Sequence, residues 1–180
     1  MQPLLEYKKI PSPLTGEGRV RVKMKGIVIY DTTYGNTRRI GETIAETLKA
    51  AGIEVDTFYV KDVKKLSAGD YDFLVIGSPT KFGTMSFTVK GFLGKVKGEE
   101  WKYRPFAAFD TENPENIEQK QGSAAEKIAE KLKEKQMSQL LPVLKAVVLD
   151  WKGPLQEGEI ERTKKYAGEL AAKLKKERIS

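Results

Sequence analysis

The fold is decided by the segment Ile27-Val28-Ile29-Tyr30-Asp31-Thr32-Thr33-Tyr34-Gly35-Asn36-Thr37, in which an apolar run leads into a turn rich in hydroxyl groups. The apolar run is typical of a buried strand, and Ile40, Ile44 and Leu48 then recur on one helical stripe. At such a junction the first helical N–H groups lack intrahelical partners and the helix dipole is positive, which favours an anion. We therefore predict that this turn binds a phosphate through Thr32, Thr33, Asn36 and Thr37, with close approach at Gly35. Threonine and asparagine also favour turns and helix caps on their own account, so the turn alone leaves that plainer interpretation open.

Five apolar runs, most of them followed by a helical pattern, indicate an α/β fold with parallel strands joined by helices. The expected strands cover 27–31, 53–59, 72–77, 105–109 and 145–150. The expected helices begin near residues 36, 85, 124 and 159, with a short helix or turn over 61–67. Right-handed crossovers fit the strand order 2-1-3-4-5, which opens a ligand crevice at the carboxyl ends of the first and third strands.

The 180 residues are enough for one domain, which we place at 26–180, preceded by an arm at 1–25. Within the arm, basic and apolar residues alternate from Arg19 to Lys25, which is typical of a half-exposed strand. Two interpretations stay open, an added edge strand and an arm that joins two copies in a homo-oligomer. We find no apolar run of about 20 residues and no signal-peptide pattern, so we expect a soluble, cytoplasmic protein without a membrane partner.

The chain contains no cysteine and no histidine. Thiolate nucleophiles, disulfides, iron–sulfur ligation by cysteine and histidine general bases are therefore excluded, and redox chemistry would need a bound cofactor. The net charge of +7 comes from the two ends, since 1–25 and 161–180 each carry +4. Because glutamates are interspersed among the basic residues of 161–180, a solvated helical face explains this charge better than a nucleic-acid surface does.

The turn at 32–37 resembles the phosphate loop of flavodoxins, usually written T/S-x-T-G-x-T, which holds the 5′-phosphate of FMN. Tyr34 departs from this pattern, because it stands where the family commonly has a hydroxyl residue before the glycine. The resemblance implies a flavodoxin-like three-layer sandwich with a five-stranded parallel sheet and a non-covalently bound FMN. It also implies that the Tyr34 backbone N–H still faces the phosphate.

A second loop, Gly77 to Ser86, reads G-S-P-T-K-F-G-T-M-S and is similar to the flavin-contacting loop of the flavodoxin-like NAD(P)H:quinone oxidoreductases. The resemblance implies that this loop contacts the ribityl chain and ring. A bulky ring such as Phe82 offers a flat apolar face to a tricyclic ligand, and Lys81 is expected near that ring. The implied contacts are Ser78, Pro79, Thr80, Lys81, Phe82 and Gly83.

The third loop, 110–122, corresponds to the family's second flavin-contacting loop by position alone, which implies contacts from Asp110 and Thr111. Many members of the family carry a stacking aromatic residue here, and this loop has none. Trp101, Tyr103 or Trp151 would have to replace it, or the second ring face stays open, and we favour the open face. An open face suits a substrate that stacks on the flavin.

Two functions follow. The first is an FMN-binding redox protein, either an electron carrier or an FMN-dependent NAD(P)H oxidoreductase, and a cation near the flavin would favour two-electron reduction. The alternative is a flavodoxin-like interaction or scaffold domain that binds no flavin. No G-x-G-x-x-G turn follows the first strand, which argues against a dinucleotide-binding Rossmann domain. We propose no catalytic acid, base or nucleophile and no metal ligand, and the redox partner stays undefined.

Overall fold

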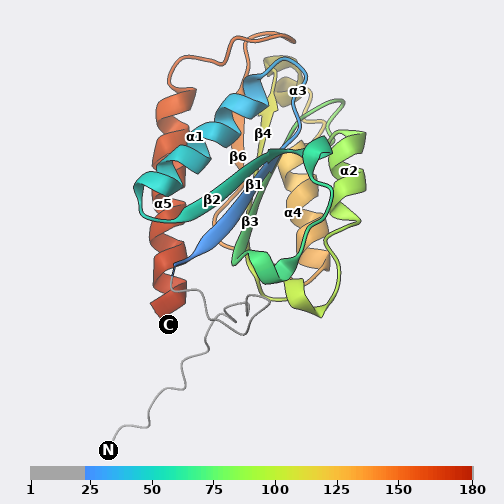
Figure 1. Ribbon diagram of the computed structural model, residues 1–180. Helices are drawn as coiled ribbons and strands as arrows, with labels where there is room; N and C mark the ends of the chain where they lie inside the picture. Colours follow the sequence, from blue (N-terminus) through green and yellow to red (C-terminus); the bar gives the residue numbers. More distant parts are fainter. Residues whose placement is uncertain (1–22, 180) are drawn as a thin grey trace, which may run out of the picture.

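The computed structural model describes residues 23–179, which form a parallel six-stranded sheet covered on both faces by helices (Figure 1). The sheet runs in the order β2-β1-β3-β4, and two short strands, β5 and β6, both pair with β4. This confirms the predicted order 2-1-3-4-5, with one strand more than expected. The strands are β1 (Lys25–Tyr30), β2 (Glu54–Tyr59), β3 (Phe73–Pro79), β4 (Pro105–Glu112), β5 (Ser138–Gln139) and β6 (Leu144–Val147).

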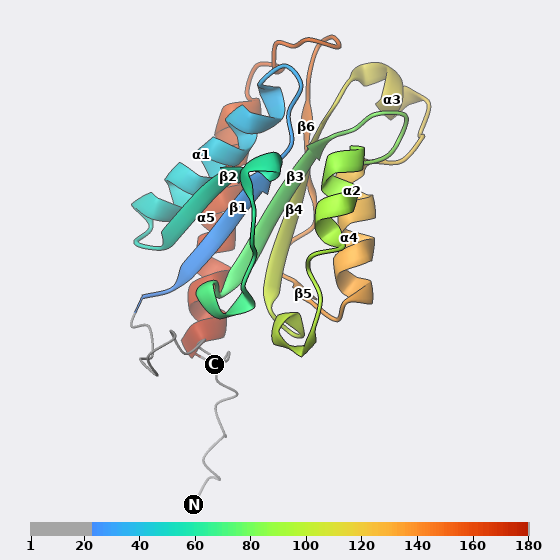
Figure 2. The same ribbon diagram turned by 45° about the vertical axis from the view of Figure 1, so that its right-hand side comes forward.

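The helices form the two outer layers of the sandwich, with α1 and α5 on one face of the sheet and α2 and α4 on the other (Figures 1 and 2). Within the described part of the chain, no helix is both long enough and apolar enough to cross a membrane. The α-helices are α1 (Asn36–Ala50), α2 (Phe87–Leu93), α3 (Pro114–Glu118), α4 (Ala124–Glu134) and α5 (Glu159–Ile179), and short 3-10 turns cover Val60–Asp62, Ala68–Asp70 and Glu99–Trp101.

Each face of the sheet has its own hydrophobic core. Along β1, Ile27 and Ile29 pack into the core beneath α2 and α4, while Val28 and Tyr30 pack into the core beneath α1 and α5. Because both faces are buried, β1 reads as a continuous apolar run rather than as an alternating one. The central strands β3 and β4 are buried along nearly their whole length for the same reason.

The predicted fifth strand, 145–150, is wrong in its extent. The fifth position in the sheet is shared by β5, which pairs with the start of β4, and β6, which pairs with its end. Pro142 lies between them, and proline lacks the N–H that a continuous strand would need.

The predicted third loop, 110–122, is also wrong in part. The strand β4 continues through Asp110 and Thr111 to Glu112, and Pro114–Glu118 forms α3. Asn113 caps this helix by accepting a hydrogen bond from the Asn116 N–H, and Pro114 occupies its first turn. Asn113 and Pro114 therefore start a short helix in a segment that we had predicted to be a loop. The expected edge strand at 19–25 lies almost wholly outside the described residues, and β1 begins at Lys25.

The centre of the sheet requires a residue without a side chain at position 77. In the parallel register Gly77 pairs with Tyr30 on one side and with Phe109 on the other. The buried ring of Phe109 lies where a side chain on Gly77 would begin, since a Cβ built there would come within 2.2 Å of two ring atoms. The large ring can therefore fill the core directly below the carboxyl ends of β1, β3 and β4.

Replacing this glycine should destabilise the fold. We expect Gly77→Ala to lower the free energy of unfolding by about 1–3 kcal/mol, because the Phe109 ring has to move in a tightly packed core. Gly91→Ala is the matched control, since Gly91 lies in α2 with open space around its Cα. There the change should raise the free energy of unfolding by up to about 1 kcal/mol. Urea denaturation of both variants measures this, and equal effects would contradict the packing argument.

Candidate functional site

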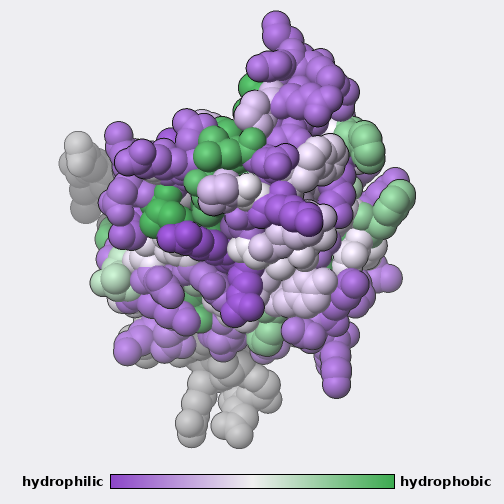
Figure 3. All heavy atoms as spheres, turned by 90° about the horizontal axis from the view of Figure 1, so that it is seen from above, coloured by the Kyte–Doolittle hydropathy of each residue, from purple (hydrophilic) through white to green (hydrophobic). Residues whose placement is uncertain are grey.

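The segments that follow β1, β3, β4 and β6 meet at the carboxyl end of the sheet and line a cleft. Figure 3 views this end of the molecule, where hydrophilic residues dominate and small hydrophobic groups interrupt them. The cleft has two adjoining pockets that share Thr80, Asn113 and Trp151. The first pocket is lined by Thr32, Thr33, Tyr34, Asn36, Thr37, Pro79, Thr80, Lys81, Thr111, Asn113, Val148 and Trp151. The second is lined by Thr80, Phe82, Asn113, Glu115, Asn116, Gln119, Gln121 and Trp151.

The start of α1 borders the first pocket, and no side chain caps it. Gly35 precedes the helix with a φ of 92°, and its N–H donates to Thr32 Oγ1 at 2.9 Å. The first turn contains no acidic residue, whereas α2, α3 and α4 are each capped by a side-chain oxygen. The first N–H groups of α1 have no intrahelical acceptor. They therefore leave a positive helix end directed at a pocket lined by hydroxyl groups.

Lys81 adds a full positive charge to the same place. Its ammonium group donates to Thr33 Oγ1 at 3.0 Å, so it joins the loop after β3 to the turn after β1. Lys81 also lines the first pocket, and our expectation that it lies near a planar ring stays a prediction. Together with the helix end, this charge suits a phosphate group.

Hydrogen bonds between loops hold this pocket together. Thr37 and Thr111 share a buried hydrogen bond of 2.7 Å between their hydroxyl groups, which joins the start of α1 to the end of β4. Asn36 Nδ2 donates to the Lys152 carbonyl at 3.1 Å, which attaches the loop after β6 to the same helix end. The two residues therefore position the site as well as line it.

Four residues predicted to contact a ligand line neither pocket. Gly35 precedes the helix at the turn described above. Ser78 is fully buried, and its hydroxyl accepts from the Ser86 N–H at 2.9 Å. Gly83 donates from its N–H to Asn116 Oδ1 at 3.1 Å. Asp110 lies beneath Thr80, whose hydroxyl donates to Asp110 Oδ2 at 3.0 Å. All four shape the loops that carry the lining residues.

The structure also adds lining residues that sequence reasoning missed. Asn113, Glu115, Asn116, Gln119 and Gln121 come from the segment around α3 and bring polar groups to the second pocket. The combination of Asn113 and Pro114 is a helix-start signal and could have located this segment. Val148 follows β6, and nothing in the sequence pattern marks it as a lining residue.

Asp110 is buried at the centre of this network. The pKa of its carboxyl group is raised to about 7, mainly by burial; donors such as the Ala125 N–H oppose the rise, and the nearby Glu112 carboxylate adds to it. Oδ1 of Asp110 is buried and has no hydrogen-bond partner. Burial also raises the pKa of Glu112. Burial therefore favours the protonated form of the Asp110 side chain in the folded protein.

Comparison with known proteins identifies relatives of the chain. The sequence pattern of the family described as flavodoxin matches residues 28–162. A flavodoxin from Aquifex aeolicus is 38% identical over 78 residues, which cover 43% of this chain and 42% of that protein. An NAD(P)H dehydrogenase (quinone) from Cupriavidus metallidurans is 28% identical over 94 residues, which cover 41% and 47%. The chain thus spans less than half the length of these two curated relatives.

Among solved structures, oxidised flavodoxin 1 from Bacillus cereus superimposes with a TM-score of 0.71 at 20% identity. The superposition covers 82% of this chain and 97% of that one. At this identity the likeness concerns the fold alone. It agrees with the strand order of the sheet.

The raised pKa of Asp110 gives a pH dependence of stability. Between about pH 4, where an unfolded aspartate ionises, and pH 7, the folded chain binds more protons, so the free energy of unfolding falls as the pH rises. Asp110→Asn should reduce the difference in unfolding free energy between pH 5 and pH 8 by about 1–3 kcal/mol. Urea denaturation at both pH values measures it. Glu118→Gln, at an exposed site, is the control, and an unchanged pH dependence in Asp110→Asn would contradict the assignment.

Proposed function

The chain belongs to the flavodoxin family, and on that basis we propose that its cleft binds FMN and that the protein transfers electrons through this flavin. The observation that carries the proposal is the uncapped, positive start of α1, which faces a pocket lined by Thr32, Thr33 and Thr37. These residues fit a phosphate dianion, because they combine hydroxyl donors, backbone N–H groups and the helix dipole.

The remainder of the cleft fits the rest of the cofactor. Thr80 and Asn113 line both pockets and offer polar groups to a ribityl chain that runs from one pocket into the other. The second pocket combines the exposed Phe82 ring with the amide groups of Gln119 and Gln121. An aromatic face beside amide donors and acceptors matches the apolar and polar parts of a flavin ring.

The chain's own residues bind and orient, and the flavin supplies the redox chemistry when bound. The sequence contains no cysteine or histidine that could take this role. Lys81 neutralises negative charge at the phosphate end, and Thr111 orients Thr37. Asn36 holds the loop after β6 against the start of α1.

We further propose that the protein is an electron carrier, and the second candidate is an NAD(P)H-dependent reductase. The hydrogen bond from the Lys81 ammonium to Thr33 supports the carrier, because it directs this charge toward the proposed phosphate position rather than toward the flavin ring. The similarity to an NAD(P)H dehydrogenase (quinone) favours the reductase.

Absorption spectroscopy and turnover measurements test the function. Purified protein, or apoprotein mixed with FMN and then desalted, should retain one flavin per chain and show its visible absorption bands. As a carrier it should oxidise NAD(P)H slowly with and without a quinone, and should accept electrons from dithionite. Rapid quinone-dependent oxidation of NAD(P)H would support the reductase instead. Failure to retain any flavin would contradict the proposal as a whole.

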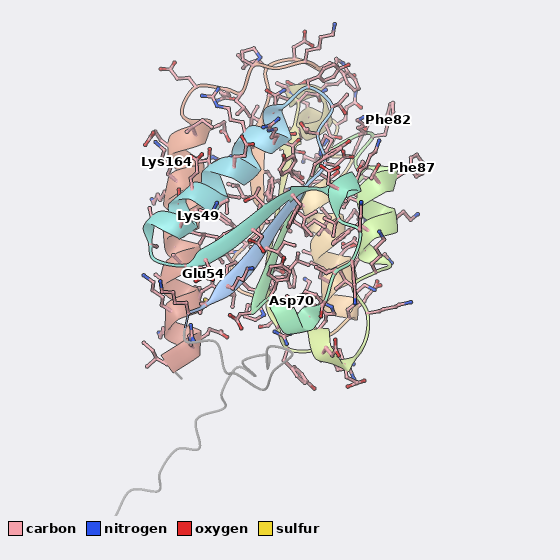
Figure 4. All side chains as sticks on the ribbon, in the orientation of Figure 1. Lys49, Glu54, Asp70, Phe82, Phe87 and Lys164 are labelled. Atoms are coloured by element: carbon pink, nitrogen blue, oxygen red, sulfur yellow. The ribbon has the colours of Figure 1, made fainter. Side chains whose placement is uncertain are left out.

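The ammonium of Lys81 should distinguish FMN from riboflavin. We expect Lys81→Met to raise the dissociation constant of FMN roughly 3- to 20-fold and to leave that of riboflavin nearly unchanged, because only FMN carries the phosphate. Lys49→Met, at the opposite end of α1, is the matched control (Figure 4). Fluorescence titration of the apoproteins measures both constants. An equal loss of both ligands would show that Lys81 does not act on the phosphate.

A further inference from the structure

Two exposed aromatic rings lie beside each other in the lining of the second pocket. The rings of Phe82, in the loop after β3, and Trp151, in the loop after β6, have centroids 6.5 Å apart and planes inclined by 56°. Phe82 is 84% exposed and Trp151 is 54% exposed. Two large rings left in water side by side, within a cleft, indicate a surface that binds an apolar partner.

The loop backbone holds Phe82 in this exposed position. Phe82 has a φ of 50°, a left-handed conformation that is costly for a residue with a bulky side chain. The turn is closed by reciprocal backbone hydrogen bonds of 2.9 and 3.1 Å between Lys81 and Thr84. Gly83 is enclosed as well, since a Cβ built there would come within 2.0 Å of the Gln121 carbonyl oxygen. Figure 4 shows Phe82 projecting outward on the side of the molecule where α2 lies.

The loop that carries Trp151 is fixed from the other side. Asn36 Nδ2 donates to the Lys152 carbonyl, and Gly153 packs so closely on Asn36 that an added Cβ would lie 2.7 Å from its Oδ1. Leu149 donates from its N–H to the Pro154 carbonyl at 2.9 Å, which closes the loop. Trp151 is therefore attached to the helix end that borders the first pocket, and it lines both pockets.

The other aromatic residues considered for this role lie elsewhere. Trp101 is 2% exposed and belongs to the core beneath α2 and α4. Tyr103 lies two residues before the start of β4, at the end of the strand opposite the cleft. Tyr34 lines only the first pocket. The segment from Asp110 to Ser123, where flavodoxins commonly carry a stacking aromatic residue, has none.

We propose that Trp151 stacks on one face of the flavin ring while Phe82 covers the other, an inference that rests on the proposed function. A planar ring between two aromatic rings separates their centroids by about 7 Å, twice the van der Waals stacking distance. The two rings already stand 6.5 Å apart, so rotation of two exposed side chains brings them parallel. The stacking residue thus comes from the loop after β6, and our expectation of an open second face is replaced by a covered one.

Titration of the apoproteins with riboflavin and with FMN tests the role of Trp151. Trp151→Leu should raise both dissociation constants by the same factor, roughly 5- to 150-fold, because it removes a ring contact and no phosphate contact. The emission of the bound flavin should also increase, since a stacked indole quenches flavin fluorescence. Trp151→Phe should recover most of the affinity, and Tyr103→Leu, an exposed aromatic residue away from the cleft, should behave like the wild type.

The outcomes separate this inference from the proposed function. A wild type that binds FMN, together with a Trp151→Leu variant of unchanged riboflavin affinity and unchanged flavin emission, would overturn the stacking role and leave the proposed function intact. A loss confined to FMN would also overturn it, because it would place Trp151 at the phosphate. A wild type that binds neither ligand would overturn both. Circular dichroism of each variant confirms that it is folded, as expected for a change at an exposed residue.

Discussion

The site depends on the parallel register of β1, β3 and β4. Tyr30, Gly77 and Phe109 lie side by side across these three strands, so the carboxyl ends of the strands lie at the same edge of the sheet and their loops meet. Gly77 lets the Phe109 ring fill the core directly beneath this meeting point. The cleft is therefore a product of the core packing, because a larger residue at position 77 would displace the strands whose ends carry the site.

Above that core, single hydrogen bonds join loops that are far apart in the sequence. Thr37 with Thr111, Asn36 with the Lys152 carbonyl, and Thr80 with Asp110 connect the segments after β1, β3, β4 and β6. Asn36, Thr37, Thr80 and Thr111 also line the cleft, so the same side chains shape the cleft and hold its loops together. The Thr37–Thr111 bond is buried, so loss of either hydroxyl would leave the other without a partner, which is costly.

The sequence predicted the strand order and the first two loops, because those features follow from local signals. The apolar run 27–30 and the threonine-rich turn behind it are contiguous, and their positions in space follow from topology alone. Features that arise between distant segments were missed or misplaced. Lys81 contacts Thr33 and Trp151 lies beside Phe82 only because separate loops converge. Pro142 is a local signal for the division of the fifth strand. We missed it because the prediction rested on the apolar residues that follow the proline.

The uncapped start of α1 also has a consequence for the stability of the folded chain. A helix whose first N–H groups find their acceptor on a ligand is less stable when the ligand is absent. A ligand that binds only the folded chain raises the free energy of unfolding in proportion to the logarithm of the ligand concentration, once that exceeds the dissociation constant. A chain that lacks an anion at this helix end would therefore open there more easily, and an open segment is more accessible to proteases. The lifetime of the folded chain would then depend on the supply of the anion that occupies this position.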